Sequence, residues 1–389
     1  MRVLHVAYSL GIGGIESWLI ELLRQIRRQK LNDLTFDFYL SEPGGCYEEE
    51  ARSYGSTIYY APKLTRVQKG LELLGLYNPW RQLEAFLREK HYDVFHSHSV
   101  LSGGFHAKAA ARAGIPTRVI HCHCSRYSED DRPPVTLKGK IRYRRFLQNN
   151  IPNILRYATA ITPCSSNAAR FLLGESWHNC RKCRVVFCGM STERYRKLAR
   201  CRAEVRVQYG LDEEVNVVGH AGRMGAYVKN QPFLIDIFGE LFRRDSSCRL
   251  FLAGDGALRP EFQRHAREKG LESVVLFPGY CDTVPLMTNC FDLFALPSLA
   301  EGLPITGMEA AAAGLFTVCS DVITPDFTEA FPDRVRTIPL DAPLSVWADA
   351  LEEGLTKKLT LEQGCQLLEE SPFSIRSSLE ALLNIYQGH

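Results

Sequence analysis

Short apolar segments that suit β-strands alternate with amphipathic helical patterns along nearly the whole chain, and this alternation limits the folds open to it. The first strand is expected at Val3–Ala7. The helix after it has apolar residues at i, i+3, i+4 and i+7 spacing between Ile15 and Ile26. Parallel strands need crossover connections, which are usually helices. The sequence therefore predicts an α/β protein whose parallel sheets are covered by helices.

The alternation occurs twice, with a polar stretch at 196–214 between the two halves. Further strands are expected at Phe36–Leu40, Thr57–Tyr60, Val94–Ser97, Arg118–Cys122, Ala160–Pro163, Val185–Cys188, Val215–Ala221, Arg249–Ala253, Val274–Phe277, Leu293–Leu296 and Phe316–Cys319. Further helices are expected at 79–90, 103–113, 166–173, 230–243, 258–269, 283–289, 304–313 and 375–386.

A length of 389 residues suits two domains, since a domain usually has ~100–200 residues. We predict two Rossmann-like domains whose sheets face a central cleft. The first spans 1–195 and is completed by the C-terminal helix 373–389, which packs back on it; the second spans 196–372. Ligands of open parallel sheets bind beyond the carboxyl ends of the strands, so the loops that follow strands are the candidate sites.

The two halves differ in charge. The net charge is +3, but residues 1–200 hold 31 basic and 17 acidic side chains, whereas residues 201–389 hold 16 and 27. A basic half suits a phosphate-rich partner or a membrane surface. Electrostatic attraction between the two oppositely charged halves is the alternative explanation of these charges.

The 13 cysteines are an odd number, which favours free thiols in a reducing compartment over a disulfide framework. No apolar run is long enough to span a membrane, and the N-terminus lacks the pattern of a signal peptide, so we expect a cytoplasmic protein. Cys180 and Cys183 form a C-x-x-C pair, with His178 and Cys188 nearby. A structural zinc usually draws on a second such pair, which is missing, so we predict an ordinary loop and no metal.

Three loops that follow strands hold candidate site residues. In the first, Gly13 and Gly14 open the helix after the first strand, where a glycine turn brings a phosphate close to free backbone N–H groups. Glu16 occupies the place of the third glycine of a dinucleotide fingerprint, which argues against dinucleotide binding. A plain tight turn between strand and helix is the alternative.

In the second loop, Gly222 and Arg223 come directly after a strand of the acidic half, and Lys229 follows. Arg can bind an oxyanion pair through two parallel hydrogen bonds, and Lys supplies a compact charge. A solvated pair of surface cations explains the same pattern.

In the third loop, Glu301 precedes a proline-started helix that carries Glu309. An ionised carboxylate only accepts hydrogen bonds, which suits sugar hydroxyl groups as donors. The alternative is an acidic residue that complements the helix dipole, and it accounts for one glutamate but not for both.

These segments together resemble glycosyltransferase family 4, which is retaining and has the GT-B fold. The resemblance is carried by GRMGAYVKN, LFLAGDGALRPEF, VLFPGYCDTVPLM and FALPSLAEGLPITGMEAAAAG over 217–320, and more loosely by DVFHSHS at 93–99 and VIHCHCS at 119–125. Bacterial capsular and exopolysaccharide transferases are the most similar members. The Asn and Asp that the family often has before its linker are replaced here by Cys188 and Ser191.

The resemblance implies roles for individual residues. Arg223 and Lys229 would hold the diphosphate of the donor, Glu309 its ribose and Glu301 its sugar. The backbone of the loop would line sugar and phosphate, together with the glycines that approach the diphosphate: Gly302, Leu303, Pro304, Ile305, Gly222, Gly13 and Gly14. A histidine at the end of the strand near 120 would touch the sugar. Both His121 and His123 fit this position, and we favour His123.

The expected reaction is transfer of a sugar from a nucleotide sugar, preferably a UDP-sugar, to a hydroxyl group of a glycan or a lipid-linked acceptor, in surface polysaccharide synthesis. We expect front-face attack in which the leaving phosphate helps to deprotonate the acceptor; a covalent intermediate on Glu301 is the alternative. No cofactor or metal is expected. A sugar-nucleotide epimerase of the same two-lobed architecture and a non-enzymatic sugar-nucleotide or glycan-binding protein remain the alternative functions.

A basic amphipathic segment is a candidate membrane contact. Residues 138–156 interleave Lys and Arg with apolar side chains, a pattern that suits a helix lying on an anionic lipid surface. A solvated helix face is the other interpretation. No nucleic-acid partner is expected.

Overall fold

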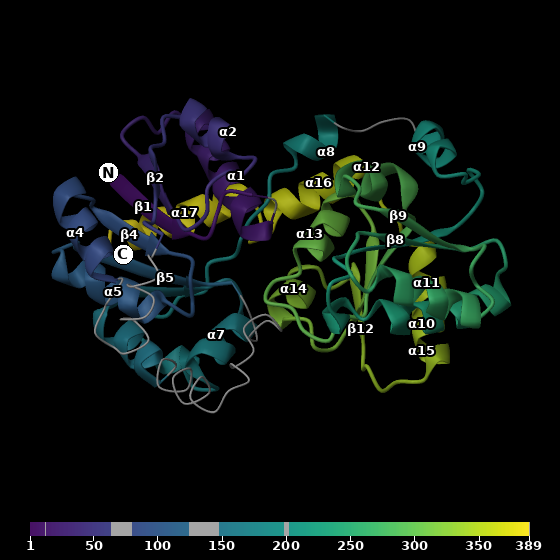
Figure 1. Cartoon of the computed structure of the whole chain (residues 1–389). Helices are drawn as coiled ribbons and strands as arrows, with labels where there is room; N and C mark the ends of the chain where they lie inside the picture. The colour runs from purple at the N-terminus through teal and green to yellow at the C-terminus, as the bar shows by residue number, and fades with distance from the viewer. Residues whose placement is uncertain (12, 64–79, 124–147, 198–201, 389) are drawn as a thin grey trace. The chain divides into compact units, whose positions relative to one another are not determined.

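The computed structural model describes residues 1–11, 13–63, 80–123, 148–197 and 202–388. The chain divides into two compact units (Figure 1). The N-terminal unit consists of Met1–Gly189 together with Ile375–His389, and the C-terminal unit of Met190–Ser374. The acceptor and donor roles expected for the two parts remain predictions, as does a cleft between them.

The N-terminal unit is built on a parallel sheet of six strands in the order β3-β2-β1-β4-β5-β6. The strands are β1 Arg2–Ala7, β2 Thr35–Leu40, β3 Ile58–Tyr60, β4 Val94–Ser97, β5 Thr117–Cys122 and β6 Ala160–Pro163. Strands β1, β4 and β5 are neighbours although they are far apart in the sequence. Their carboxyl ends therefore lie side by side at the centre of the sheet edge.

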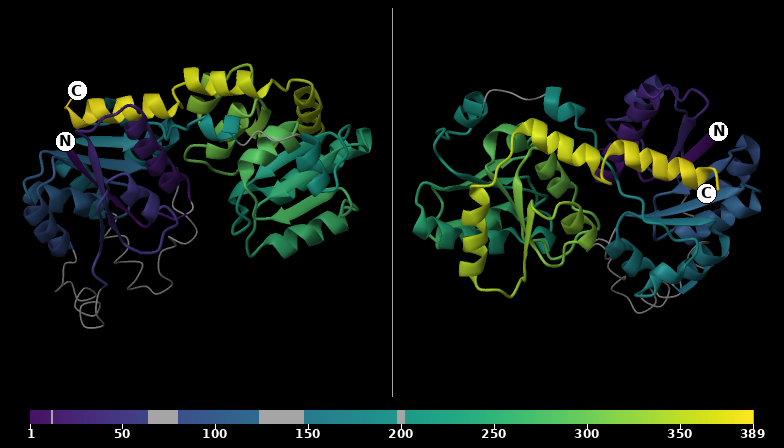
Figure 2. Two further views of the ribbon diagram at one scale, coloured as in Figure 1. Left: turned by 90° about the horizontal axis from the view of Figure 1, so that it is seen from above. Right: turned by 180° about the vertical axis from the view of Figure 1, so that it is seen from behind.

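Helices cover this sheet on both faces, as the sequence predicts. They are α1 Gly14–Arg28, α2 Glu48–Ser53, α4 Trp80–Lys90, α5 Gly103–Arg112, α7 Ser166–Leu173 and, from the chain end, α17 Ile375–Tyr386, with a 3₁₀ turn η2 at Trp177–Asn179. Helix α1 buries one stripe, including Leu19 and Leu22, because these residues recur at helical spacing. Helix α17 packs beside α1 (Figure 2). Trp18 Nε1 donates to Ser378 Oγ across 2.8 Å.

The C-terminal unit repeats the architecture with a six-stranded parallel sheet in the order β12-β11-β10-β7-β8-β9. Its strands are β7 Val217–Ala221, β8 Arg249–Ala253, β9 Val275–Gly279, β10 Leu293–Leu296, β11 Phe316–Ser320 and β12 Val335–Ile338. Its helices are α8 Glu193–Lys197, α9 Arg202–Gln208, η3 Tyr227–Lys229, α10 Gln231–Arg244, α11 Arg259–Glu268, α12 Thr283–Pro285, η4 Leu286–Cys290, α13 Ile305–Ala312, α14 Pro325–Ala330, α15 Leu344–Leu355 and α16 Leu361–Glu370.

One expected strand is wrong. Val185–Cys188 contains buried apolar residues, but it is not a strand. Beside β6, Cys183 forms an isolated bridge to Ile161, and Val186 N–H donates to Pro163 O at 2.9 Å. Alternating burial indicates which side chains face the core, whereas a strand also requires a continuous ladder of backbone hydrogen bonds to its neighbour. The sequence also missed β12 and several helices, and part of the polar stretch at 196–214 is the helix α9.

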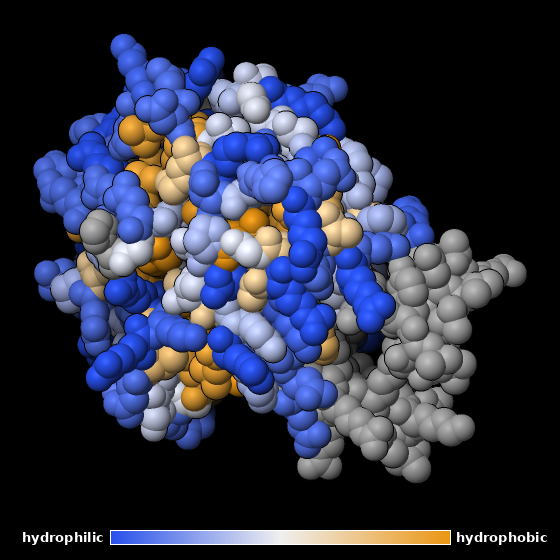
Figure 3. All heavy atoms as spheres, turned by 90° about the vertical axis from the view of Figure 1, so that its left-hand side faces the viewer, coloured by the Kyte–Doolittle hydropathy of each residue, from blue (hydrophilic) through white to orange (hydrophobic). Residues whose placement is uncertain are grey.

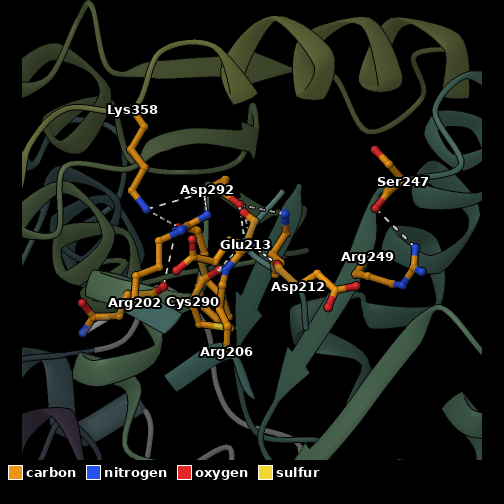
Figure 4. Close-up of polar contacts among 12 residues, drawn as sticks. Arg202, Arg206, Asp212, Glu213, Ser247, Arg249, Cys290, Asp292 and Lys358 are labelled. Carbon is orange, nitrogen blue, oxygen red and sulfur yellow. Dashed lines mark hydrogen bonds and ion pairs between the residues drawn. The ribbon is translucent and has the colours of Figure 1, made fainter. Parts of the chain in front are cut away.

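Helix α9 is fixed to the sheet of the C-terminal unit by a cluster of charges (Figure 4). Asp292, directly before β10, accepts hydrogen bonds from the fully buried Arg206 at 2.7 Å and from Arg202 at 2.5 Å. Lys358 Nζ lies 3.6 Å from the same carboxylate, and burial lowers its pKa to about 8. Three cations therefore depend on one carboxylate.

In the part of the chain that the structure describes, no helix combines the length and the apolar composition needed to cross a membrane. Of the segment 138–156, residues 138–147 lie outside the described residues, and 148–157 are helical. The face drawn in Figure 3 is mostly hydrophilic, with small separate apolar groups.

Candidate active site

The carboxyl edge of the sheet in the C-terminal unit brings together two residues that the sequence places 72 positions apart. Lys229, at the end of η3, donates from Nζ to Glu301 Oε1 across 2.6 Å, and the two side chains are 23% and 11% exposed. Ser298 Oγ donates to the same oxygen at 2.8 Å. Glu301 is therefore held by one cation and one hydroxyl group.

The backbone of the two loops supports this pair. Leu299 N–H donates to Val228 O at 2.8 Å, which joins the loop after β10 to the loop after β7. Asn230 follows Lys229 in the left-handed region, with φ of 55°, and so turns the chain from η3 into α10. Asn tolerates this conformation better than most residues.

Arg223 lies exposed after Gly222, and its guanidinium forms no ion pair with any residue that the structure describes. A Cβ atom on Gly222 would lie 3.0 Å from Lys229 Cγ and 3.1 Å from His220 Nε2. The absence of a side chain at Gly222 therefore lets the stem of Lys229 pass close to the strand end.

His220, on β7, is a site residue that the sequence reasoning missed. Its Nδ1–H donates to Ala295 O at 2.8 Å, which leaves Nε2 as an acceptor. That nitrogen is buried and has no partner among the described residues. Burial lowers the pKa of His220 to about 4, against the opposing effect of the Ala295 carbonyl. The sequence signal that could have identified His220 is its position immediately before Ala221, at the carboxyl end of the strand.

Glu309 lies half-buried on α13, where Thr283 Oγ1 donates to its Oε2 at 3.4 Å. Burial raises the pKa of Glu309 to about 7, although the Thr283 hydrogen bond acts in the opposite direction. The charge of Glu309 contributes to a raised pKa of Tyr195, after burial as the main cause. The Tyr195 hydroxyl is buried without a partner among the described residues, and the sequence pointed to neither Thr283 nor Tyr195.

The loop between Glu301 and α13 has the predicted position. Leu303 and Pro304 are buried, Gly302 and Ile305 are half-buried, and the helix begins at Ile305. Gly13 and Gly14 lie in the N-terminal unit, at the start of α1. Gly13 is extended rather than left-handed, and its carbonyl accepts from Ser17 N–H at 2.9 Å.

The matching edge of the N-terminal unit holds a buried array of histidines. His5 Nδ1 lies 2.9 Å from His98 Nε2, and His98 Nδ1 lies 3.0 Å from His123 Nε2. His123 Nδ1 in turn lies 3.4 Å from Cys188 Sγ. Both ring nitrogens of His98 and of His123 are therefore engaged.

A second row runs beside the first. His96 Nδ1 lies 2.6 Å from the Tyr386 hydroxyl, and its Nε2 lies 3.2 Å from His121 Nδ1. His121 is completely buried and its Nε2 has no partner among the described residues, whereas His123 is half-buried. Burial lowers the pKa of His123 to about 3, and burial and neighbouring histidines lower that of His121 well below 6.5.

The C-x-x-C segment does not gather with other described residues into a group of three potential metal ligands. Potential ligand atoms within 4.8 Å of one another occur in His5, His96 and His98, and in His98, His121 and His123, but the rings of His121 and His123 are stacked at 4.0 Å and 14°. Burial raises the pKa of Cys183 to about 12, so its thiol is protonated near neutral pH.

Comparison with known proteins identifies the family. Residues 12–194 match glycosyltransferase family 4, and residues 215–355 match the glycosyl transferases group 1. EpsF of Bacillus subtilis (strain 168), which is assigned as a glycosyltransferase, is 30% identical over 394 residues, covering 99% of this chain and 96% of EpsF. The chain belongs to glycosyltransferase family 4. The resemblance seen in the sequence is thereby confirmed.

Other similar proteins have lower sequence identity. The Escherichia coli UDP-Gal:alpha-D-GlcNAc-diphosphoundecaprenol alpha-1,3-galactosyltransferase is 22% identical over 272 residues, covering 68% of this chain and 66% of that enzyme. Crystal structures of HepE from Anabaena, in complex with UDP and with UDP-glucose, have TM-scores of 0.75 and 0.73 at 17% identity and cover both chains fully. This likeness confirms the GT-B fold class.

Proposed function

We propose that this glycosyltransferase moves a sugar from a nucleotide-sugar donor, preferably a UDP-sugar, to a hydroxyl group of a glycan or lipid-linked acceptor, with retention of configuration. The observation that carries the proposal is the Lys229–Glu301 pair at the carboxyl edge of a parallel sheet, with an exposed Arg223 in the loop that also holds Lys229. HepE binds UDP and UDP-glucose, and the E. coli relative is named for a UDP-Gal donor and a diphosphoundecaprenol acceptor.

The roles follow from the charges. Arg223 has no competing anion among the described residues, so it is free to bind the diphosphate. Lys229 balances Glu301 at rest and would turn toward the phosphate when the donor enters. Glu309 would accept hydrogen bonds from the ribose hydroxyl groups once it is ionised, which its pKa of about 7 permits at slightly alkaline pH. The backbone at Gly302, Leu303, Pro304 and Ile305, with Gly222, would line the donor.

Retention follows most simply from front-face attack. The bond between the anomeric carbon and the phosphate oxygen breaks while the acceptor oxygen bonds to the same carbon, and the acceptor proton passes to the leaving phosphate. Glu301 Oε1 already accepts from Lys229 and Ser298, which weakens this carboxylate as a nucleophile. The arrangement favours an electrostatic role for Glu301 over a covalent intermediate.

Lys229 and Arg223 can neutralise a diphosphate between them, and we propose that the transfer step itself needs no metal. The sugar contact predicted for His121 or His123 is harder to accommodate. His121 is completely buried, and both nitrogens of His123 are engaged by His98 and Cys188. A polysaccharide-related acceptor, and contact with an anionic membrane through 138–156, remain part of the proposal.

The proposal is tested by screening nucleotide sugars for thermal stabilisation of the purified chain, with EDTA present. A bound donor raises stability by mass action, so the right donor should stand out. Arg223→Ala should abolish this shift, while Arg243→Ala, an exposed arginine on α10, should keep it.

Product analysis separates the alternatives. Transfer of the sugar to an added acceptor supports the proposal. A free epimer formed without acceptor would show an epimerase, and donor binding without turnover would show a binding protein; either result would refute the proposed transfer.

A further inference from the structure

We propose that Arg202 and Lys358 bind a small phosphate group, either inorganic phosphate or the terminal phosphate of a phosphate monoester. The two side chains meet at Asp292, which directly precedes β10 (Figure 4). Glu301 follows the same strand, so the proposed site lies at the amino edge of the sheet in the C-terminal unit, opposite to the candidate active site. This inference does not rest on the proposed transferase reaction.

The charges around Asp292 do not balance. Arg202, Arg206 and Lys358 form ion pairs with this carboxylate, and none of the three pairs with another carboxylate among the described residues. The neighbouring Cys290 thiol adds no negative charge near neutral pH, because burial raises its pKa to about 12. Two positive charges therefore lack a partner, and a phosphate dianion would supply both negative charges.

Two of the three cations keep hydrogen-bond donors for a ligand. Arg206 is completely buried, and its five N–H groups all donate, one to Asp292 and four to backbone carbonyl groups. Arg202 donates to Asp292 at 2.5 Å and to one backbone carbonyl at 3.3 Å, and Lys358 donates to one backbone carbonyl at 2.5 Å. A guanidinium has five N–H groups and an ammonium three, so both side chains can make further hydrogen bonds.

These donors lie close together and are open to solvent. Arg202 Nη2 is 2.5 Å and Lys358 Nζ is 3.6 Å from the same oxygen of Asp292, so the two cationic groups are neighbours. Their side chains are 34% and 26% exposed, which admits a small anion but not a flat lipid surface. A guanidinium binds two phosphate oxygens through parallel hydrogen bonds, and an ammonium adds a compact charge.

A cluster with a purely structural role is the alternative. Asp292 fixes α9 to the sheet through Arg202 and Arg206, and this role needs no ligand. It also does not need Lys358, whose distance of 3.6 Å from the carboxylate is too long for a hydrogen bond. Bound phosphate would give Lys358 the close anionic partner that Asp292 does not provide.

The test measures how fast Lys358 is acylated. The full chain is treated with an N-hydroxysuccinimide ester at pH 8 in the absence of nucleotide sugar, and the label on each lysine is measured by mass spectrometry. Only the neutral amine reacts, and burial lowers the pKa of Lys358 to about 8, so this lysine should react readily. Bound phosphate should raise its pKa by at least about one unit and so slow its acylation at least about fivefold.

Matched controls locate the effect. Chloride at the same ionic strength should not slow the acylation of Lys358, and phosphate should not slow that of Lys269, an exposed lysine that pairs with Asp236. Arg202→Gln should abolish the protection of Lys358 by phosphate. Arg243→Gln, which changes an exposed arginine on α10, should keep it. Circular dichroism checks that both variants are folded.

Inorganic phosphate, glucose 1-phosphate and vesicles of phosphatidylglycerol are tested separately. Slower acylation of Lys358 with either of the two free phosphates supports the proposal. It would be overturned by an unchanged rate with both of them, by equal slowing with chloride, by protection with the vesicles alone, or by full protection in Arg202→Gln. If Arg202→Gln does not fold, the comparison of phosphate with chloride in the wild-type chain decides.

Discussion

The two units share one sheet topology but differ in the chemistry at the carboxyl ends of their strands. In the C-terminal unit this edge carries charge, in Lys229, Glu301 and Arg223. In the N-terminal unit it carries buried histidines whose pKa values are lowered by burial, as for His5, to about 3. The same backbone thus presents ionic groups in one unit and neutral rings in the other.

The difference shows what the fold itself supplies. A parallel sheet brings the ends of distant strands to one edge, and the side chains placed there decide the chemistry. The charged edge suits a polyanionic donor, whereas the neutral edge suits uncharged groups. Four substitutions test whether charged groups contribute more to stability and activity in the C-terminal unit than polar groups do in the N-terminal unit.

The largest effect on stability is expected from Asp292→Ala. This change leaves the buried Arg206 without its carboxylate and removes the partner of Arg202 and Lys358. Breaking a buried ion pair from one side costs about 3–5 kcal/mol. Urea denaturation should show this loss, and Asp349→Ala, an exposed partner of Arg244, should cost well under 1 kcal/mol. Equal losses in both variants would contradict the account.

Removing the lysine of the Lys229–Glu301 pair should strongly lower the activity. Lys229→Ala is expected to lower kcat about 10²–10³-fold, as the loss of one group that stabilises developing charge typically does. Turnover of the donor found in the screen provides the measurement. Lys269→Ala removes an exposed lysine of the same unit that pairs with Asp236, and it should leave turnover intact. Near-normal turnover in a folded Lys229→Ala protein would remove the ionic edge from the mechanism.

Glu309 predicts a pH dependence. Its folded-state pKa of about 7 lies above the ordinary value of 4.5 because of burial, so the folded protein retains a proton between these pH values that the unfolded chain has lost. The contribution of Glu309 to stability is therefore greatest below pH 4.5 and falls as the pH rises to 7.

Glu309→Gln removes this titration. Relative to the wild-type chain, the variant should gain about 2 kcal/mol between pH 5 and pH 8, measured by urea denaturation at both values. Donor affinity of the wild-type chain should rise over the same range as the carboxylate ionises. The exposed Glu329→Gln, on α14, should leave the pH profile unchanged. A flat difference between Glu309→Gln and the wild type would show that the carboxyl titrates normally.

The smallest effect is expected in the N-terminal unit. Ser378 Oγ accepts from Trp18 and donates to Phe187 O at 2.7 Å, so Ser378→Ala removes the acceptor of the buried Trp18 Nε1–H and one hydrogen bond to Phe187 O. The expected loss is about 1–2 kcal/mol in urea denaturation. Arg376→Ala, at an exposed position of the same helix, should change stability little. If Ser378→Ala lost more stability than Asp292→Ala, the polar contact of the N-terminal unit would matter more than the buried charges of the C-terminal unit, contrary to the comparison.

Much of the fold could be predicted from the sequence because helix and strand periodicity are local. The strands at Val94–Ser97 and Leu293–Leu296 and the helix at Ile375–Tyr386 have the expected bounds. The edge strand β12 was missed, because its residues include exposed Arg336 and Thr337 and show no apolar run. Val185–Cys188 was wrong for the opposite reason, because it is apolar but does not form a continuous ladder with its neighbour β6.

The sequence by itself determined the α/β class, because helix and strand periodicity are local. It also determined the family and the candidate residues of the charged edge, because these are recognised from short motifs. Only the tertiary structure decided which of those residues touch. Lys229 meets Glu301 because β7 and β10 are neighbours in the sheet, and the histidines converge because β1, β4 and β5 are. Strand order depends on long-range packing, so it cannot be predicted from local sequence patterns.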